Sequence, residues 1–110
     1  MPLVKVLNLR SKDPIAAIEE AVRGAMTSLP ALKIRGDEVD VVAMRAPDDD
    51  LATVARIDVD LWEGPARTKD GLQELATNVA RAFQSVVGQD RKVKVVIQPY
   101  DIGTSGWVSF

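Results

Sequence analysis

The tetrapeptide Arg10-Ser11-Lys12-Asp13 recurs almost unchanged as Arg67-Thr68-Lys69-Asp70, 57 residues further along the chain. Each copy is followed by apolar residues spaced three or four apart, which is the spacing of one face of a helix. The tetrapeptide therefore precedes two equivalent helices, and the chain contains an internal repeat. At the same offset, the apolar residues superpose as Ile15 on Leu72, Ile18 on Leu75, Val22 on Val79, Met26 on Phe83 and Leu29 on Val86.

Strand patterns flank both helices. Residues 3–9 (LVKVLNL) and 55–61 (ARIDVDL) precede them, and residues 39–44 (VDVVAM) and 93–97 (VKVVI) follow them. Two units of this kind predict an α+β fold: a tandem βαβ pseudo-repeat that forms a four-stranded mixed sheet with two helices on one face. We expect a single domain over the 110 residues, with pseudo-repeat halves at about 1–50 and 51–110.

Such an arrangement leaves one face of the sheet without helices. Because a partly apolar sheet face needs a cover, we expect copies of the chain to pack sheet to sheet in a small oligomer. The helix ends also carry local signals. Asp13 suits the N-cap of the first helix and Pro14 its first position, while Thr68 suits the N-cap of the second helix and Gly88 its C-terminal end.

Composition excludes several classes of function. The chain has no histidine and no cysteine, which excludes Ser-His-Asp and Cys-His catalysis, zinc sites of imidazole or thiolate, and disulfides. A net charge of −2 argues against nucleic-acid binding, which usually needs a basic face. No apolar run approaches the roughly 18 residues of a membrane span, and the N-terminal residues lack the layout of a signal peptide. We expect a cytoplasmic protein with no nucleic-acid or membrane partner, no metal and no cofactor.

The first strand differs from its repeat partner at its start. At the offset of 54 that superposes residues 39–42 on 93–96, Pro2 falls on Arg56. If Met1 is removed, Pro2 carries a free secondary amine; an exposed α-amine has a pKa of about 7.7–8.0, which burial or a nearby cation lowers. Such an amine can act as a general base near neutral pH without histidine. The alternative is structural, since proline is tolerated as the first residue of a strand.

Four stretches resemble the tautomerase superfamily, which includes 4-oxalocrotonate tautomerases, macrophage migration inhibitory factor, carboxymethyl-hydroxymuconate isomerase and malonate semialdehyde decarboxylase. They are residues 1–6 (MPLVKV), 62–68 (WEGPART), 93–98 (VKVVIQ) and the tail 103–107 (GTSGW). The resemblance extends over nearly the whole chain. It implies a homotrimer with three sites, each with Pro2 as catalytic base or acid at a subunit boundary. It also implies a cofactor-independent tautomerase or isomerase whose small carboxylate substrate is a 2-oxo or 2-hydroxy-dienoic acid.

The resemblance assigns further residues to the site. Arg67 matches the family's arginine just before the second helix, where its guanidinium is expected to hold the substrate carboxylate and stabilise enolate charge. The resemblance implies four further substrate-binding residues. Arg10 matches the arginine after the first strand of 4-oxalocrotonate tautomerase, and Lys94 lies at the position of a second arginine in the shorter tautomerases. Gln98 lies near an asparagine of the cytokine-like members, and Trp107 lies where members place an aromatic wall of the pocket.

Asp37 indicates a different reaction. Residues 36–47 (GDEVDVVAMRAP) are similar to a stretch of malonate semialdehyde decarboxylase, in which an aspartate beside the proline positions or activates water. An aspartate there favours a protonated proline, and therefore hydration or decarboxylation of a related oxo acid. The chain departs from that pattern, because Pro65-Ala66-Arg67 supplies only one of the two arginines that flank the decarboxylase's proline. A third alternative is a non-catalytic trimeric module that binds acids, since fold does not determine function.

Overall fold

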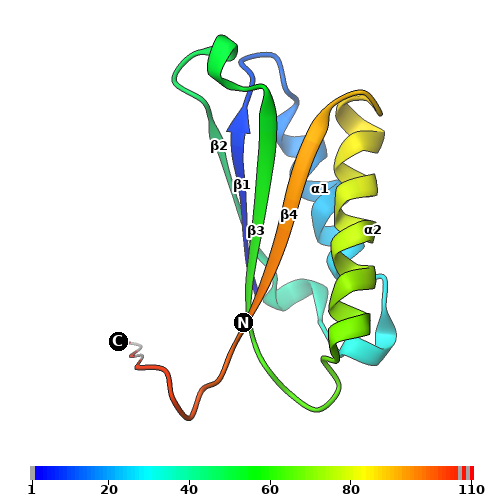
Figure 1. Ribbon diagram of the computed structural model, residues 1–110, viewed down its shortest axis with the longest axis vertical. Coiled ribbons are helices and arrows are strands. Elements are labelled where there is room, and N and C mark those ends of the chain that lie inside the picture. The colour runs from blue at the N-terminus through cyan, green and yellow to red at the C-terminus, as the bar shows by residue number, and fades with distance from the viewer. Residues whose placement is uncertain (1, 107, 109) are drawn as a thin grey trace.

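The computed structural model describes residues 2–106, 108 and 110. Figure 1 shows two helices on one face of a four-stranded sheet, whose other face is open. The predicted element order and fold class are confirmed. The elements are β1 (Leu3–Leu9), α1 (Ile15–Met26), β2 (Asp40–Arg45), β3 (Val54–Trp62), α2 (Lys69–Val87) and β4 (Lys92–Tyr100), with short 3₁₀ turns at Pro30–Leu32, Gly36–Glu38 and Asp49–Leu51.

The sheet order is β2-β1-β3-β4. Each repeat contributes one parallel pair, β1 with β2 and β3 with β4, and the two pairs meet where β1 runs antiparallel to β3. The start of β1 therefore lies beside the end of β3, and the end of β1 beside the start of β3. We call these two edges of the sheet the Pro2 end and the Arg10 end; Figure 1 shows them at the bottom and the top.

The core lies between the sheet and the helices. Val4 and Val6 of β1 and Ile57 and Val59 of β3 are fully buried. The predicted helix stripes pack against them, buried at their centres and partly buried at their ends. Burial of each such side chain stabilises the fold by roughly 1.5–3 kcal/mol. The fully buried stripe residues are Ile18, Val22 and Met26 of α1 and Leu75, Val79 and Phe83 of α2.

A β-bulge near the end of β1 changes which of its residues face the core. Asn8 has a φ of 67°, and the pairing with β2 shifts between Val6 and Leu9. Asparagine adopts this left-handed conformation more readily than most residues, and its side-chain amide donates to the carbonyls of Leu51 and Val54 (3.2 and 3.1 Å). The extra residue turns Leu9 inward, onto the face of Val6, where it is fully buried.

The repeat includes the first strand of each half, but in a different register from the one predicted. Leu3 pairs with Asp60 and shares its face of the sheet, whereas Ile57 is fully buried against the helices. An offset of 54 would superpose Leu3 on Ile57. That offset is wrong for β1 and β3, because a slip of one residue moves every side chain of a strand to the other face of the sheet.

The offset that preserves the faces of β1 and β3 is 53 residues. Pro2 therefore superposes on Ala55, and the prediction that placed it on Arg56 is wrong by one residue. β2 and β4 keep the predicted offset of 54, because each pairs with its central strand in an equivalent register.

The start of α1 also differs from the prediction. Pro14 occupies the N-cap, and α1 begins at Ile15. Asp13 does not cap the helix, because its carboxylate accepts hydrogen bonds from the N–H of Arg10 (2.6 Å) and from the guanidinium of Arg91. α1 ends at Met26, before the predicted stripe does.

The predicted ends of α2 are confirmed. The hydroxyl of Thr68 accepts from the N–H of Gly71 (3.1 Å), and Gly88 ends the helix with a φ of 115°, a conformation that favours glycine.

The open face of the sheet mixes apolar and charged side chains. Val42 and Met44 of β2 and Tyr100 of β4 are 46%, 56% and 41% exposed. Between them, Arg56 pairs with Asp58 at 2.8 Å, as the alternation of β3 predicts, and Lys5 pairs with Asp60 at 3.6 Å. Within the described residues, no helix has the length and apolar character needed to cross a membrane.

Candidate active site

Pro2 lies buried immediately before β1. Its carbonyl accepts a hydrogen bond from the N–H of Asp40 at the start of β2 (3.0 Å). The next residue, Leu3, pairs with Asp40 on one side and with Asp60 on the other. Because Pro2 adjoins the centre of the sheet, its position is held by two neighbouring strands.

Arg67 lies at the same end of the sheet, in the loop between β3 and α2. Its Nη1 donates to the carbonyl of Trp62 (2.6 Å) and its Nε to the carbonyl of Leu32 (3.3 Å). Within the described part of the chain, Nη2 has no hydrogen-bond acceptor. That nitrogen can donate to a carboxylate near the positive N-terminal end of α2.

A cavity of about 330 Å³ opens beside the start of β1, within the size range of small-molecule sites. Leu3, which follows Pro2, forms part of its lining, and Trp62 connects it to Arg67 through the hydrogen bond to the Trp62 carbonyl. The hydroxyl of Tyr100 donates to Asp60 across the lining (3.4 Å). The lining residues are Leu3, Asp60, Leu61, Trp62, Tyr100, Ser105 and Gly106.

Asp37 is at the Pro2 end as well, in the 3₁₀ turn before β2, but it is exposed. Arg35 donates to both of its carboxylate oxygens, from Nη2 at 2.7 Å and from Nε at 3.1 Å. The hydrogen bonds and the charge of Arg35 lower the pKa of Asp37. Its carboxylate is therefore ionised at neutral pH and already engaged by a neighbour.

Known structures share this architecture, although no family model and no curated protein sequence matches the chain. The R7 fused 4-OT, an asymmetric trimer, superposes with a TM-score of 0.78 over 96% of this chain and 91% of that chain, at 16% identity. FG41 malonate semialdehyde decarboxylase inhibited by 3-bromopropiolate gives 0.67 over 99% and 89%, at 17% identity. A 5-carboxymethyl-2-hydroxymuconate delta-isomerase gives 0.66 over 100% and 88%, at 16% identity. The chain has the tautomerase-superfamily fold.

In this tautomerase fold, the two candidates on β4 lie on the open face of the sheet. Gln98 pairs with Asp60, level with Leu3, and its side chain donates to the carbonyl of Pro99 (3.2 Å). Lys94 pairs with Arg56, which comes four residues before Asp60 on β3 and therefore lies about 13 Å from it along the strand. Gln98 thus shares the Pro2 end, whereas Lys94 lies towards the Arg10 end.

Arg10 and Pro2 lie at opposite ends of the seven-residue β1, roughly 20–25 Å apart along the strand. Within one chain, the tautomerase fold therefore brings Arg67, Asp37 and Gln98 to the Pro2 end but leaves Arg10 and Lys94 away from it. Trp107 lies outside the described residues.

Sequence reasoning missed Arg91, a buried charge at the start of β4. Its Nη1 and Nη2 each donate to a different carboxylate oxygen of Asp13 at 2.9 Å, and its guanidinium lies 5.9 Å from the ring centre of Phe83. The repeat contains a signal for this residue: at the offset of 54 between β2 and β4, Arg91 falls on Asp37, so the two halves carry opposite charges at this position. Over the described residues, no group of three or more histidine, cysteine or acidic side chains is arranged to hold a metal ion.

Proposed function

We propose that this protein is a cofactor-independent tautomerase or isomerase of 2-oxo or 2-hydroxy-dienoic acids, with Pro2 as its general base. The observation that carries the proposal is the position of Pro2. It is buried at the start of a central strand, at the same end as Arg67 and beside a cavity of about 330 Å³. The fold shared with a fused 4-OT and a hydroxymuconate isomerase supports the same reaction class.

In the proposed reaction, the neutral amine of Pro2 takes a proton from one position of the acid and returns it to another. Arg67 holds the carboxylate through Nη2, and its charge stabilises the enolate that forms between the two transfers. Burial of Pro2 keeps its amine unprotonated near neutral pH, because a low-dielectric site disfavours the ammonium form. A positioned base of this kind typically contributes about 10²–10⁴-fold to the rate.

Hydration or decarboxylation through Asp37 receives less support. A carboxylate that activates water must face both the water and the amine, whereas Asp37 is exposed and hydrogen-bonded to Arg35. Asp60 lines the cavity but is hydrogen-bonded by Tyr100 and paired with Lys5.

We also propose that the active form is a homotrimer. The open face of the sheet carries the exposed side chains of Val42, Met44 and Tyr100, which need a cover. The R7 and Q0 fused 4-OT structures are trimers, and their chains superpose on this one with TM-scores of 0.78 and 0.71. Sedimentation equilibrium measures the number of chains directly.

The first test is the N-terminus itself. We expect the intact mass of the protein from its native host to correspond to a chain that begins with Pro2. Titration of the ¹⁵N-labelled proline should then give a pKa below the usual 7.7–8.0 of an α-amine. Retention of Met1 on essentially all molecules excludes the mechanism, because an amide nitrogen cannot accept the proton.

Substitution of Arg67 tests the carboxylate site. Arg67→Gln should lower kcat/KM by about 10–100-fold, because a hydrogen bond to a charged group is worth about 1.5–3 kcal/mol. KM should rise with the loss of carboxylate binding, and kcat should fall with the loss of enolate stabilisation. Arg67→Lys should recover part of the loss. Arg81→Gln, an exposed position on α2, is the matched control and should leave both constants unchanged. Equal KM values for Arg67→Gln and the control contradict the assignment.

A further inference from the structure

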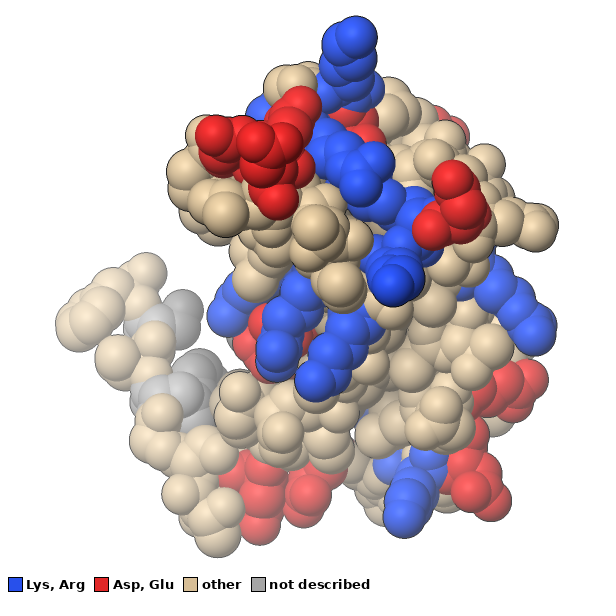
Figure 2. Space-filling model, turned by 45° about the horizontal axis from the view of Figure 1, so that its top comes forward, with Lys and Arg blue, Asp and Glu red and all other residues tan. Residues whose placement is uncertain are grey.

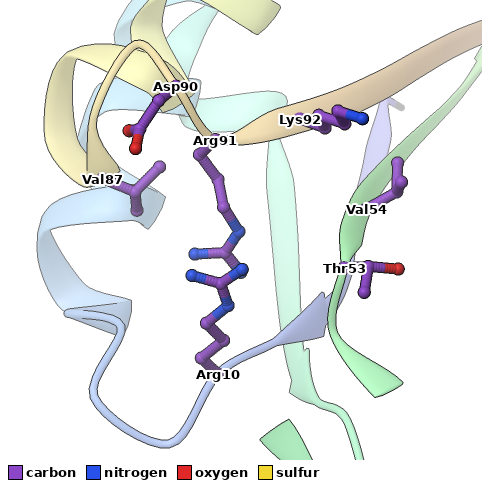
Figure 3. Close-up of a pocket in the computed structure, with 7 residues that line it drawn as sticks. All are labelled: Arg10, Thr53, Val54, Val87, Asp90, Arg91 and Lys92. Atoms are coloured by element: carbon purple, nitrogen blue, oxygen red, sulfur yellow. The ribbon is translucent and has the colours of Figure 1, made fainter. Parts of the chain in front are cut away.

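The Arg10 end carries a second and larger cavity, of about 500 Å³. Figure 3 shows Arg10 and Arg91 extending toward each other from opposite sides, with Thr53 and Val54 across from them at the start of β3. The carboxylate of Asp13, which pairs with Arg91 and accepts from the N–H of Arg10, offsets part of this positive charge. The lining residues are Arg10, Thr53, Val54, Val87, Asp90, Arg91 and Lys92.

The internal repeat relates this cavity to the Pro2 end. Arg10 is the repeat partner of Arg67, so both ends have an arginine after a central strand. The base is missing, because Ala55 occupies the position equivalent to Pro2.

The sign of the charge just before the last strand of each repeat also differs between the two ends. At the offset of 54, Asp37 and Glu38 at the Pro2 end correspond to Arg91 and Lys92 at the Arg10 end. The two ends are therefore built alike, but at the Arg10 end a basic pair replaces the acidic pair and Ala55 replaces the proline.

Arg91, which lines this cavity, has one donor without a partner in the described part of the chain. Its side chain is only 4% exposed, and its Nη1 and Nη2 are both occupied by Asp13. Its Nε is buried and has no hydrogen-bond partner among the described residues. A buried donor without an acceptor is costly, and a negative charge close to the guanidinium lowers that cost.

The charges around the cavity favour an anion. Arg10 is held by a hydrogen bond from its Nε to the carbonyl of Ala52 (3.3 Å), and Lys92 adds an exposed ammonium. Asp13 pairs with Arg91, and Asp90 is the acidic residue of the lining. The charge of Arg10 also acts on Asp13 and Asp49 outside the lining. Figure 2 shows lysine and arginine side chains gathered on this end of the molecule, with acidic side chains beside them.

Acidic side chains from the adjoining loop do not fill the cavity. The carboxylate of Asp49, in that loop, accepts from the N–H and the hydroxyl of Ser11 (2.8 and 2.7 Å). Those hydrogen bonds lower the pKa of Asp49. The carboxylate of Asp49 therefore stabilises the loop after β1.

We propose that the Arg10 end binds a small oxyanion, a carboxylate or a phosphate group, in this cavity beside the guanidinium groups of Arg10 and Arg91. Thr53 and Lys92 line the same cavity, and Lys92 adds a positive charge to it. The site binds without catalysing, and it does not depend on Pro2 acting as a base.

Nuclear magnetic resonance tests this site directly, because arginine Nε–H groups give resolved signals. Malonate and inorganic phosphate are titrated separately into the ¹⁵N-labelled full chain, with chloride at equal ionic strength as the reference. At least one of the two should shift the Arg91 Nε–H and the Thr53 and Val54 amide signals in a saturable way. Arg10→Gln should weaken that binding about 10-fold or more, which is the loss of one charge-assisted hydrogen bond, whereas Arg81→Gln should not change it.

Three results overturn the proposal: shifts that chloride reproduces, shifts confined to Arg67 and Trp62 at the Pro2 end, or equal affinities for Arg10→Gln and the unmodified chain. If Arg10→Gln does not fold, Lys92→Gln at an exposed position replaces it, with an expected loss of several-fold. Pro2→Ala should bind the anion as the unmodified chain does. Failure of the enzymatic proposal and failure of this site are therefore separable.

Discussion

Pro2→Ala is expected to remove part of the about 10²–10⁴-fold that a positioned base contributes to kcat/KM, measured with a 2-hydroxy-dienoic acid. Alanine leaves a primary amine, without the ring that holds the nitrogen at the start of β1. A variant that retains Met1 should lose the whole contribution, because its proline nitrogen is an amide. The measurement is the loss of the substrate's conjugated ultraviolet absorbance. It compares chains that begin at Met1, at Pro2 or at the substituted alanine after cleavage of a removable tag.

Thermal unfolding of the same preparations provides the control, since Pro2 is buried and its replacement can disturb the start of β1. The comparison is valid where the Tm values agree within a few degrees. Full turnover by the chain that retains Met1 contradicts the mechanism. The protein is then better described as a module that binds acids through Arg67 without transforming them.

Asp13→Asn is expected to lower the free energy of unfolding by about 3–5 kcal/mol, because it leaves Arg91 buried without its counter-charge. For a chain of this size, 1 kcal/mol corresponds to roughly 4–8 °C in Tm, so the decrease should exceed about 12 °C. The substitution also alters the acceptor of the Arg10 N–H, which shapes the turn before α1. Calorimetry of both proteins at neutral pH measures the effect.

The same ion pair predicts a pH dependence. Burial alone raises the pKa of Asp13, but the hydrogen bonds from Arg91 and from the Arg10 N–H, together with the charges of both arginines, outweigh it and lower the pKa below 3.8. A carboxyl whose pKa is lower in the folded state stabilises the fold above its unfolded pKa, and this stabilisation is lost as the pH falls through the folded value. The difference in Tm between the unmodified chain and Asp13→Asn should therefore be constant above about pH 5 and shrink below 3.8.

Asp37→Asn is the matched control, because it breaks an arginine–aspartate pair of the same chemistry on the surface. The side chains of Arg35 and Asp37 are 69% and 67% exposed, and solvent screens such pairs strongly. Its Tm should stay close to that of the unmodified chain. Equal decreases for the two variants indicate that burial of the Asp13–Arg91 pair has no particular effect on stability.

The sequence by itself determined the repeat, the order of the elements, the fold class and the buried centres of both helices. These follow from local periodicity: residues such as Leu75, Val79 and Phe83 recur at helical spacing, and the strand β3 alternates every two residues. The cap at Thr68 was also predictable, because a capping side chain binds a backbone N–H only three residues away.

Only the tertiary structure decided what depends on pairing between distant segments. The pairing of β1 with β3 and β2 set the register of the first strand, so that Pro2 corresponds to Ala55 and not to the arginine that follows it. Asp13 was expected to cap a helix, but a guanidinium 78 residues away competes for its carboxylate. The antiparallel pairing of β1 with β3 places Arg67 near Pro2 and Arg10 far from it. Residue types and spacing show neither result, because both arginines occupy equivalent places in the repeat and only the sheet determines which strand end each one joins.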